Sequence, residues 1–159
     1  MIDFVFKNWT RQKTPAEKFF NKILEVAAKE LKLKDDFSIS VNIVSESKIN
    51  TLNKKYRKKN KPTDVLSFPL NNQQPITNNQ RQITRLPNCP ITDIGDIFVC
   101  LSIAKNDAKS ENISINRKLA QLTVHGFLHL QGYEHEKSKK EAEKMFKLER
   151  KILSKIRCF

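Results

Sequence analysis

The alternation of apolar and polar positions predicts four strands. Residues 37–43, FSISVNI, alternate strictly and are typical of a half-buried strand. Residues 94–101 are apolar almost throughout, which favours a strand in the middle of a sheet. Shorter strands are expected at residues 2–6 and 65–68.

Apolar residues recur at helical spacing in the segments between these strands. Thr14, Pro15 and Glu17 predict the first helix start, with Thr14 as cap and Glu17 completing a capping box. Ser45 or Ser47 is expected to cap the second helix. The buried side of that helix is expected to carry Ile49, Leu52 and Tyr56.

Three more helices are expected in the second half of the chain. Ser102 is expected to cap a short one, and Ser114 a long one that contains two histidines. Residues 137–156 carry an apolar stripe typical of a last helix. About five helices and four strands in mixed order predict an α+β (mixed α/β) fold, with one small sheet packed against helices.

Residues 71–90 interrupt this pattern. They read NNQQPITNNQRQITRLPNCP, which is rich in Asn and Gln and contains three prolines. Such a composition predicts a long flexible loop. We expect one domain over residues 1–159, since too little core would lie on either side of a boundary here.

The charge balance favours a polyanionic partner. Lys and Arg number 30 against 17 Asp and Glu, a formal net charge of +13. Nucleic acid is the first candidate for such a chain and an anionic membrane the second. Abundant Lys, Asn and Ile also fit a bias of AT-rich coding, so the charge alone does not decide between a function and a compositional bias.

The three cysteines indicate a reducing compartment. Cys89, Cys100 and Cys158 are odd in number and widely spaced, so they imply no disulfide framework. The N-terminal residues lack the long apolar core of a signal peptide, and no stretch has transmembrane length. We therefore expect a cytoplasmic protein with no membrane partner.

The histidines of the chain lie in one short stretch. His125 and His129 are four residues apart, which places both imidazoles on one face of a helix. Gly132 is suited to end that helix in a left-handed conformation, after which the chain can return His135 to the same point. A single His pair is often a surface accident, but three around a glycine turn predict a metal site, for which imidazoles suit zinc. Nickel, copper and iron stay open by ligand type alone.

The spacing of His, His, Gly and His is that of metzincin peptidases. Gly126 stands where a zincin peptidase carries its glutamate general base. This difference argues against peptide hydrolysis, although a metalloprotease-like peptidase is kept as an alternative.

Several stretches, in order and spacing, resemble the YbeY family of bacterial endoribonucleases. They are LN at 52–53 with YR at 56–57, PTDVLSFP at 62–69, GDI at 95–97, HGFLHLQGYEH at 125–135, and Met145 with Glu149. The similarity runs from about residue 36 to the C-terminus. The chain departs from the family pattern at Glu134, where Asp is usual, and at Lys118 and Gln121, where Glu and His are frequent.

The resemblance implies one Zn²⁺ held by His125, His129 and His135, and a functionally important arginine at Arg57. We expect Arg57 and His125 to be the catalytic residues. The implied activity is cleavage of single-stranded RNA in ribosomal RNA processing and ribosome quality control. Implied partners are ribosomal RNA, ribosomal subunits and a ribosome-assembly GTPase.

The chemistry of such a site suits a phosphodiester. Three neutral imidazoles leave the ion dipositive, with a fourth position open to water. Arg57 can pair with a phosphate oxygen, and the basic run at residues 54–61 can hold flanking phosphates. The general base is left open among Glu134, Glu136 and an RNA 2′-hydroxyl.

Two further questions stay open from the residues alone. Asp64 and Asp96 are candidates to orient a histidine ligand. The non-catalytic alternative is a ribosome-binding factor with structural zinc, in which Cys89, Cys100 or Cys158 completes a four-ligand shell.

Overall fold

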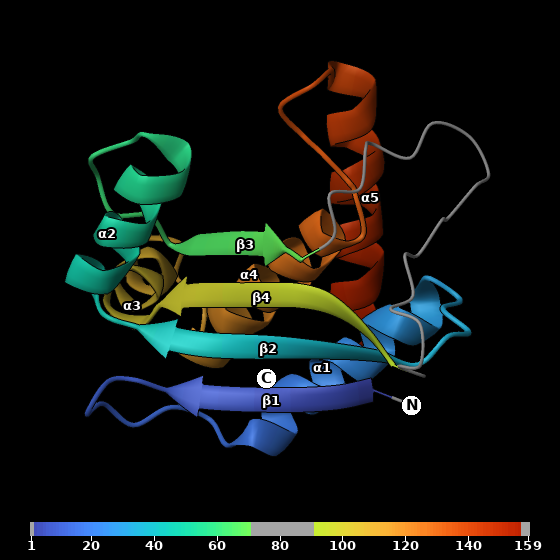
Figure 1. Cartoon of the computed structure of the whole chain (residues 1–159), viewed down its shortest axis with the longest axis horizontal. Helices are drawn as coiled ribbons and strands as arrows, with labels where there is room; N and C mark the ends of the chain where they lie inside the picture. The colour runs from blue at the N-terminus through green and yellow to red at the C-terminus, as the bar shows by residue number, and fades with distance from the viewer. Residues whose placement is uncertain (1, 71–90, 157–159) are drawn as a thin grey trace.

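The fold is built on one mixed four-stranded sheet. A computed structural model describes residues 2–70 and 91–156. The strand order is β1-β2-β4-β3, shown in Figure 1. β1 pairs with β2 and β2 with β4 in parallel, whereas β3 runs antiparallel to β4. The strands are β1 (Ile2–Asn8), β2 (Phe37–Val44), β3 (Val65–Pro69) and β4 (Thr92–Cys100).

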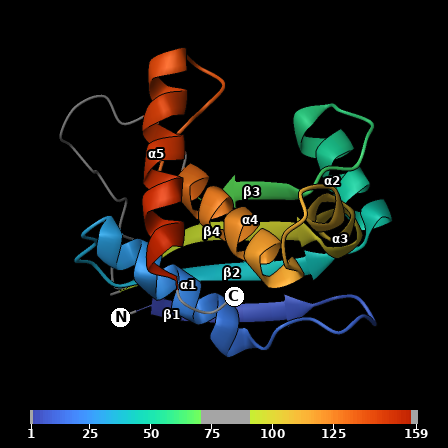
Figure 2. The same cartoon turned by 180° about the vertical axis from the view of Figure 1, so that it is seen from behind.

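Five helices complete the described part of the chain. Figures 1 and 2 together show α1, α4 and α5 on one side of the sheet, and α2 beside the start of β3. The predicted mixed fold with β4 in the sheet interior is thus confirmed, whereas the loop predicted at 71–90 lies outside the described residues. The helices are α1 (Glu17–Glu30), α2 (Glu46–Arg57), α3 (Leu101–Ser110), α4 (Ile115–Leu130) and α5 (Lys139–Lys155).

Two of the predicted helix starts are wrong, each by two residues. Ala16 occupies the N-cap position of the first helix without a side-chain cap, and the Thr14 hydroxyl instead accepts a hydrogen bond from Asn8 Nδ2 at 3.3 Å. α3 is capped by Cys100 and not by Ser102. Its start is set by β4, whose last residue donates its backbone N–H to the Asp64 carbonyl at 2.8 Å.

The predicted serine caps of α2 and α4 are confirmed. Ser45 accepts from the backbone of Lys48, and Ser114 accepts from Arg117 at 3.1 Å. The expected buried side of α2 is only partly correct. Ile49 is fully buried, but Tyr56 is 57% exposed.

α4 is the central helix and packs unusually close to the sheet. A Cβ atom added at Gly126 would lie 2.8 Å from Ile97 Cγ2 and 2.9 Å from Ser67 Oγ. The Ser67 hydroxyl donates to the Gly126 carbonyl at 3.1 Å, which ties α4 to β3. A glycine at this position therefore lets the helix lie against β3 and β4, and it fixes which side of α4 faces away from the sheet.

None of the helices within residues 2–70 and 91–156 combines the length and apolar content that crossing a bilayer requires.

Candidate metal centre

Three imidazoles converge beside the C-terminal end of α4. Ring centroids of His125 and His129 lie 4.8 Å apart, and each lies 5.1 Å from that of His135. One ligand nitrogen from each residue falls within 4.8 Å of the other two. The three side chains predicted to converge therefore lie together in the structure.

The turn that returns His135 has the form expected from the sequence. α4 ends at Leu130, and Gly132 follows with a φ of 82°, in the left-handed region that glycine tolerates. The backbone N–H groups of Gly132 and Tyr133 donate to the carbonyls of His129 and Leu128, at 2.9 and 3.0 Å. The turn is thus held by capping hydrogen bonds that satisfy the helix end.

Glu149 on α5 orients the first histidine. Its Oε2 lies 3.0 Å from His125 Nδ1, so that nitrogen carries the proton it donates to the carboxylate. The lone pair of His125 Nε2 then faces His129 Nε2, 3.1 Å away. Two imidazole nitrogens this close can bind one cation together, and a carboxylate behind a histidine is typical of zinc sites. The residues present therefore fit a metal ion.

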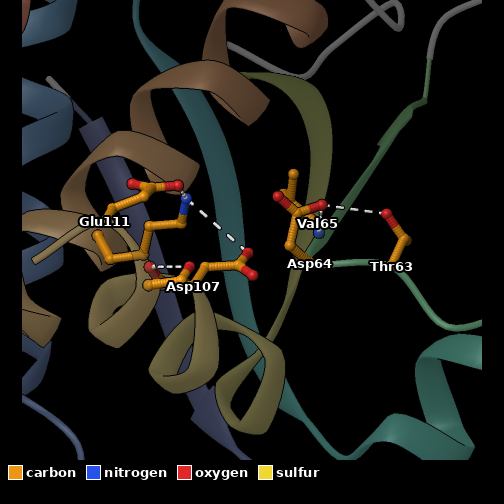
Figure 3. Close-up of polar contacts among 7 residues, drawn as sticks. Thr63, Asp64, Val65, Asp107 and Glu111 are labelled. Atoms are coloured by element: carbon orange, nitrogen blue, oxygen red, sulfur yellow. Dashed lines mark hydrogen bonds and ion pairs between the residues drawn. The ribbon is translucent and has the colours of Figure 1, made fainter.

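The sequence hypothesis that Asp64 or Asp96 orients a histidine is wrong for both residues. Asp64 accepts from the Thr63 hydroxyl at 3.0 Å and from the Val65 backbone at 2.9 Å, as Figure 3 shows. Asp96 accepts from the Ser40 hydroxyl on β2. Each carboxylate thus serves the local backbone or the sheet, and the histidine partner comes from another helix.

Burial favours the neutral form of His129, which is the form that binds metals. Loss of hydration lowers the pKa of His129, and the neighbouring His125 lowers it further. Glu134 Oε1 lies 3.6 Å from His129 Nδ1 and opposes this shift. Neutral imidazoles are the form that coordinates metal, so the surroundings of His129 favour it.

The histidines open into a cleft of about 820 Å³ that also contains Arg57. Arg57 is the last residue of α2, and its Nη2 lies 3.2 Å from Glu136 Oε1. The Arg57 guanidinium lowers the pKa of the Glu136 carboxyl, and Lys59 adds to this effect. Arg57 and the metal candidates, 68 or more residues apart in sequence, therefore share one cavity.

Only part of the basic run predicted to bind phosphates lines this cleft. Within residues 54–61, Tyr56 and Arg57 belong to its wall. The lysines of the run are exposed around them.

The far end of the cleft contains a buried lysine. Lys118 is only 8% exposed, and its Nζ lies 2.5 Å from Glu111 Oε1 and 3.8 Å from Asp107 Oδ2. Figure 3 shows these two carboxylates at the end of α3. Lys118 and Gln121, two positions where the sequence departs from the family pattern, thus both line the cleft beyond the histidines.

The described cysteine lies apart from the histidines. Cys100 is buried in a small apolar cluster with Val44, Ile49 and Leu66, and its sulfur lies 3.4 Å from the Ser102 hydroxyl. It belongs neither to the histidine cluster nor to the cleft wall. Cys89 and Cys158 are outside the described residues.

Glu149 is the site residue whose role the sequence reasoning missed. It lies 24 residues after His125 and on another helix, so no local spacing links the two. Two sequence signals point to this residue: its position between the buried residues Met145 and Ile152 of α5, and its place with Met145 among the stretches that resemble the family.

A mixed sheet whose buried helix presents a histidine cluster to a cleft defines a candidate α/β metalloenzyme. The family model described as Endoribonuclease YbeY matches residues 3–157. The chain therefore belongs to the YbeY endoribonuclease family, as the sequence motifs indicated.

Individual relatives agree with this assignment. An Endoribonuclease YbeY of Limosilactobacillus reuteri is 40% identical over 134 residues, covering 82% of this chain and 81% of the relative. One of Persephonella marina is 34% identical over 143 residues, covering 90% and 85%. A solution structure of a Thermotoga maritima protein matches with a TM-score of 0.59 and 28% identity, over 97% of this chain and 87% of that one.

Proposed function

We propose that this protein is a zinc-dependent endoribonuclease that cleaves single-stranded RNA during ribosomal RNA processing and ribosome quality control. The observation that carries the proposal is the shared cleft. Three convergent imidazoles, a carboxylate behind one of them, and a guanidinium lie around a single cavity. Membership of a family named for endoribonuclease activity supports the choice of RNA as substrate.

The proposed roles follow from the donor chemistry. A bound zinc ion supplies Lewis acidity and makes hydroxide available near neutral pH. His125, His129 and His135 hold the ion, and Glu149 keeps His125 in the tautomer that binds it. Arg57 exchanges Glu136 for a phosphate oxygen of the substrate, since a guanidinium matches both anions.

The partners proposed are ribosomal RNA and ribosomal subunits in the cytoplasm, with a ribosome-assembly GTPase as an additional one. The net charge of +13 supports a polyanionic partner.

The peptidase alternative has no support in the cleft. Position 126, where a zincin carries its glutamate, packs against Ile97 and Ser67 of the sheet. A longer side chain there would displace α4 from the sheet, so this position cannot supply a general base. The structural-zinc alternative needs a thiolate, and Cys100 lies in a separate cluster. Metal spectroscopy that detects a sulfur ligand would favour that alternative over an open catalytic site.

The decisive experiment is cleavage of a defined single-stranded RNA and of the same sequence as a duplex. The zinc-loaded protein is expected to cut the single strand, and His125→Ala and Arg57→Ala are expected to lose most of this activity. Lys29→Ala, which removes an exposed cation of α1 away from the cleft, is the matched control and retains it. Equal cleavage by all four proteins would mean a contaminating nuclease and would overturn the proposal.

A further inference from the structure

Two exposed aromatic rings line the cleft. Five large apolar side chains are exposed in the described residues, namely Val5, Trp9, Tyr56, Leu70 and Phe146. Of these, Tyr56 at 57% and Phe146 at 40% belong to the cleft wall. An exposed aromatic ring lacks the free energy that burial would contribute. Two such rings around one cavity therefore indicate a ligand with an apolar face.

The Tyr56 ring is supported by two further aromatic rings. Its centroid lies 4.9 Å from that of Phe68 at an interplanar angle of 61°, and Phe68 in turn makes an edge contact with Phe98 at 5.6 Å. Phe68 and Phe98 are half-buried against the apolar cluster between α2 and the sheet. Tyr56 is therefore the outermost ring of a supported series, which restricts its motion while more than half of it stays exposed.

Basic residues flank this ring in the sequence. Arg57 is the next residue and lines the same cleft. Lys55 Nζ lies 5.2 Å from the Tyr56 ring centroid, and Lys54, Lys58 and Lys59 are exposed nearby in the chain. An exposed aromatic ring within a basic surface is the combination that binds single-stranded nucleic acid, because the cations hold phosphates while the ring stacks on a base.

We propose that Tyr56 is a base-stacking residue for an unpaired nucleotide adjoining the phosphate that Arg57 binds. The inference rests on the proposed endoribonuclease function and adds a physical basis for the choice of single strands. In a duplex both faces of an internal base are covered by its neighbours, so the base cannot stack on Tyr56 without being unstacked.

Phe146 is the less suitable test of stacking. Its ring stacks on the His135 imidazole, with centroids 5.6 Å apart and planes at 24°. A substitution at Phe146 would disturb a candidate metal ligand, and its effect on RNA could not be assigned to a base. The ring that Tyr56 contacts is Phe68 and not an imidazole, so a substitution at Tyr56 separates the two effects.

The test measures binding of the full-length protein to a short single-stranded RNA with 2′-O-methyl groups, which block attack by the 2′-hydroxyl. Tyr56→Ala is expected to weaken binding about tenfold, or about 1.4 kcal/mol, within the range for a base stacked on an aromatic ring. Tyr56→Phe retains affinity because it keeps the ring. Tyr56→Leu still covers Phe68 but has no planar face, so it is expected to bind as weakly as Tyr56→Ala.

Trp9→Ala is the matched control. Trp9 is 66% exposed with Lys7 Nζ 5.7 Å from its ring, yet it does not line the cleft. Its loss is expected to leave affinity unchanged. Full RNA affinity in Tyr56→Leu would overturn the proposal. It would mean that Tyr56 only covers the apolar cluster beneath it and does not stack on a base. Weak binding by Tyr56→Phe would also overturn it, because the hydroxyl and not the ring would carry the contact.

A scan of single abasic sites along the RNA identifies the stacked base. At one position the missing base should weaken binding to the wild-type protein but not to Tyr56→Ala, because the two changes remove the same contact. Additive losses at every position would overturn the inference. If the wild-type protein and Arg57→Ala bind the RNA equally weakly, the proposed function fails. If the RNA binds well but Tyr56→Ala does not weaken binding, only the stacking role of Tyr56 fails.

Discussion

At the level of single residues, the carboxylate of Glu149 decides which nitrogen of His125 faces the histidine cluster. The carboxylate accepts from Nδ1 at 3.0 Å, and this leaves Nε2 with its lone pair toward His129. Without this acceptor the imidazole can exchange tautomers and rotate, so part of the binding energy for a metal would be used to order the ring.

Removal of this carboxylate should therefore weaken metal binding without removing a ligand. Glu149→Ala is expected to lower zinc affinity about 10- to 100-fold, the usual effect of losing a partner of a metal-binding histidine. Competition with a chromophoric chelator measures it. Glu143→Ala, an exposed glutamate of the same helix outside the cleft wall, should bind zinc as the wild type does. Identical affinities for the two variants would show that His125 does not depend on α5.

The ion pair of Arg57 with Glu136 sets a second expectation. A phosphate and Glu136 compete for the same guanidinium, which lies 3.2 Å from the carboxylate. Glu136→Gln should thus strengthen single-stranded RNA binding, but by less than about fivefold, because exposed pairs contribute at most about 1 kcal/mol. Glu143→Gln corrects for the general change in net charge. An unchanged or weaker affinity in Glu136→Gln, beyond that control, would mean that the two anions do not compete.

At the level of elements, α4 carries the site because it packs so closely on the sheet. The same contact that brings Gly126 against Ile97 and Ser67 turns His125 and His129 toward the cleft. Ile97 is fully buried in a central strand, and its Cγ2 branches next to the backbone, so it has little freedom to move aside.

Gly126→Ala is expected to destabilise the protein although alanine favours helices. The gain in helix propensity is about 1 kcal/mol, and overpacking of a core contact costs about 1–3 kcal/mol. We expect a net loss of up to about 2 kcal/mol, measured as a lower denaturant midpoint with an unchanged slope. A midpoint equal to or above that of the wild type would show that α4 can shift away from β3 at little cost.

The elements that could be predicted from sequence are those with a strong local pattern. The alternation in β2 and the serine caps of α2 and α4 act through neighbouring residues, and the structure retains them. The starts of α1 and α3 depend on groups that lie outside the capping segments. Asn8 engages the Thr14 hydroxyl, and the Asp64 carbonyl accepts from the last residue of β4. Such partners outside the helix override the capping preference of a single side chain.

Part of the candidate site could be predicted from local sequence patterns, and part could not. The cluster of His125, His129 and His135 follows from helical periodicity and one glycine turn, and both are local. Glu149 reaches His125 only because α5 packs on α4, and Tyr56 stays exposed because Phe68 already fills the space beneath it. Both depend on how elements pack, which the pattern of one helix does not specify.

For the whole molecule, the first and last helices are tied together by one carboxylate. Glu30 at the end of α1 accepts from Lys155 at 2.5 Å and from Lys151, both on α5. These two lysines lower the pKa of Glu30 from 4.5 to about 2. Since α5 also carries Glu149 and Phe146, this contact helps to hold the helix that positions the histidine cluster.

The shift makes stability dependent on pH in a defined window. The folded protein holds Glu30 ionised more strongly than the unfolded chain does. The stability that this ion pair contributes is therefore fully present at pH values above 4.5, the pKa of Glu30 in the unfolded chain. It is lost as the pH falls toward about 2, where the folded protein binds the proton as well. Glu30→Gln should thus be less stable than the wild type at pH 7 and lose less stability between these two pH values.

Thermal unfolding at a series of pH values measures the difference. Glu25→Gln is the control, because Glu25 is an exposed carboxylate of the same helix that accepts from Asn21 at 3.1 Å. The melting temperatures of wild type and Glu30→Gln should converge on acidification, whereas those of wild type and Glu25→Gln should stay parallel. A constant gap between wild type and Glu30→Gln down to pH 2 would show that the two lysines do not hold the ionised carboxylate. The link between α1 and α5 would then rest on apolar packing alone.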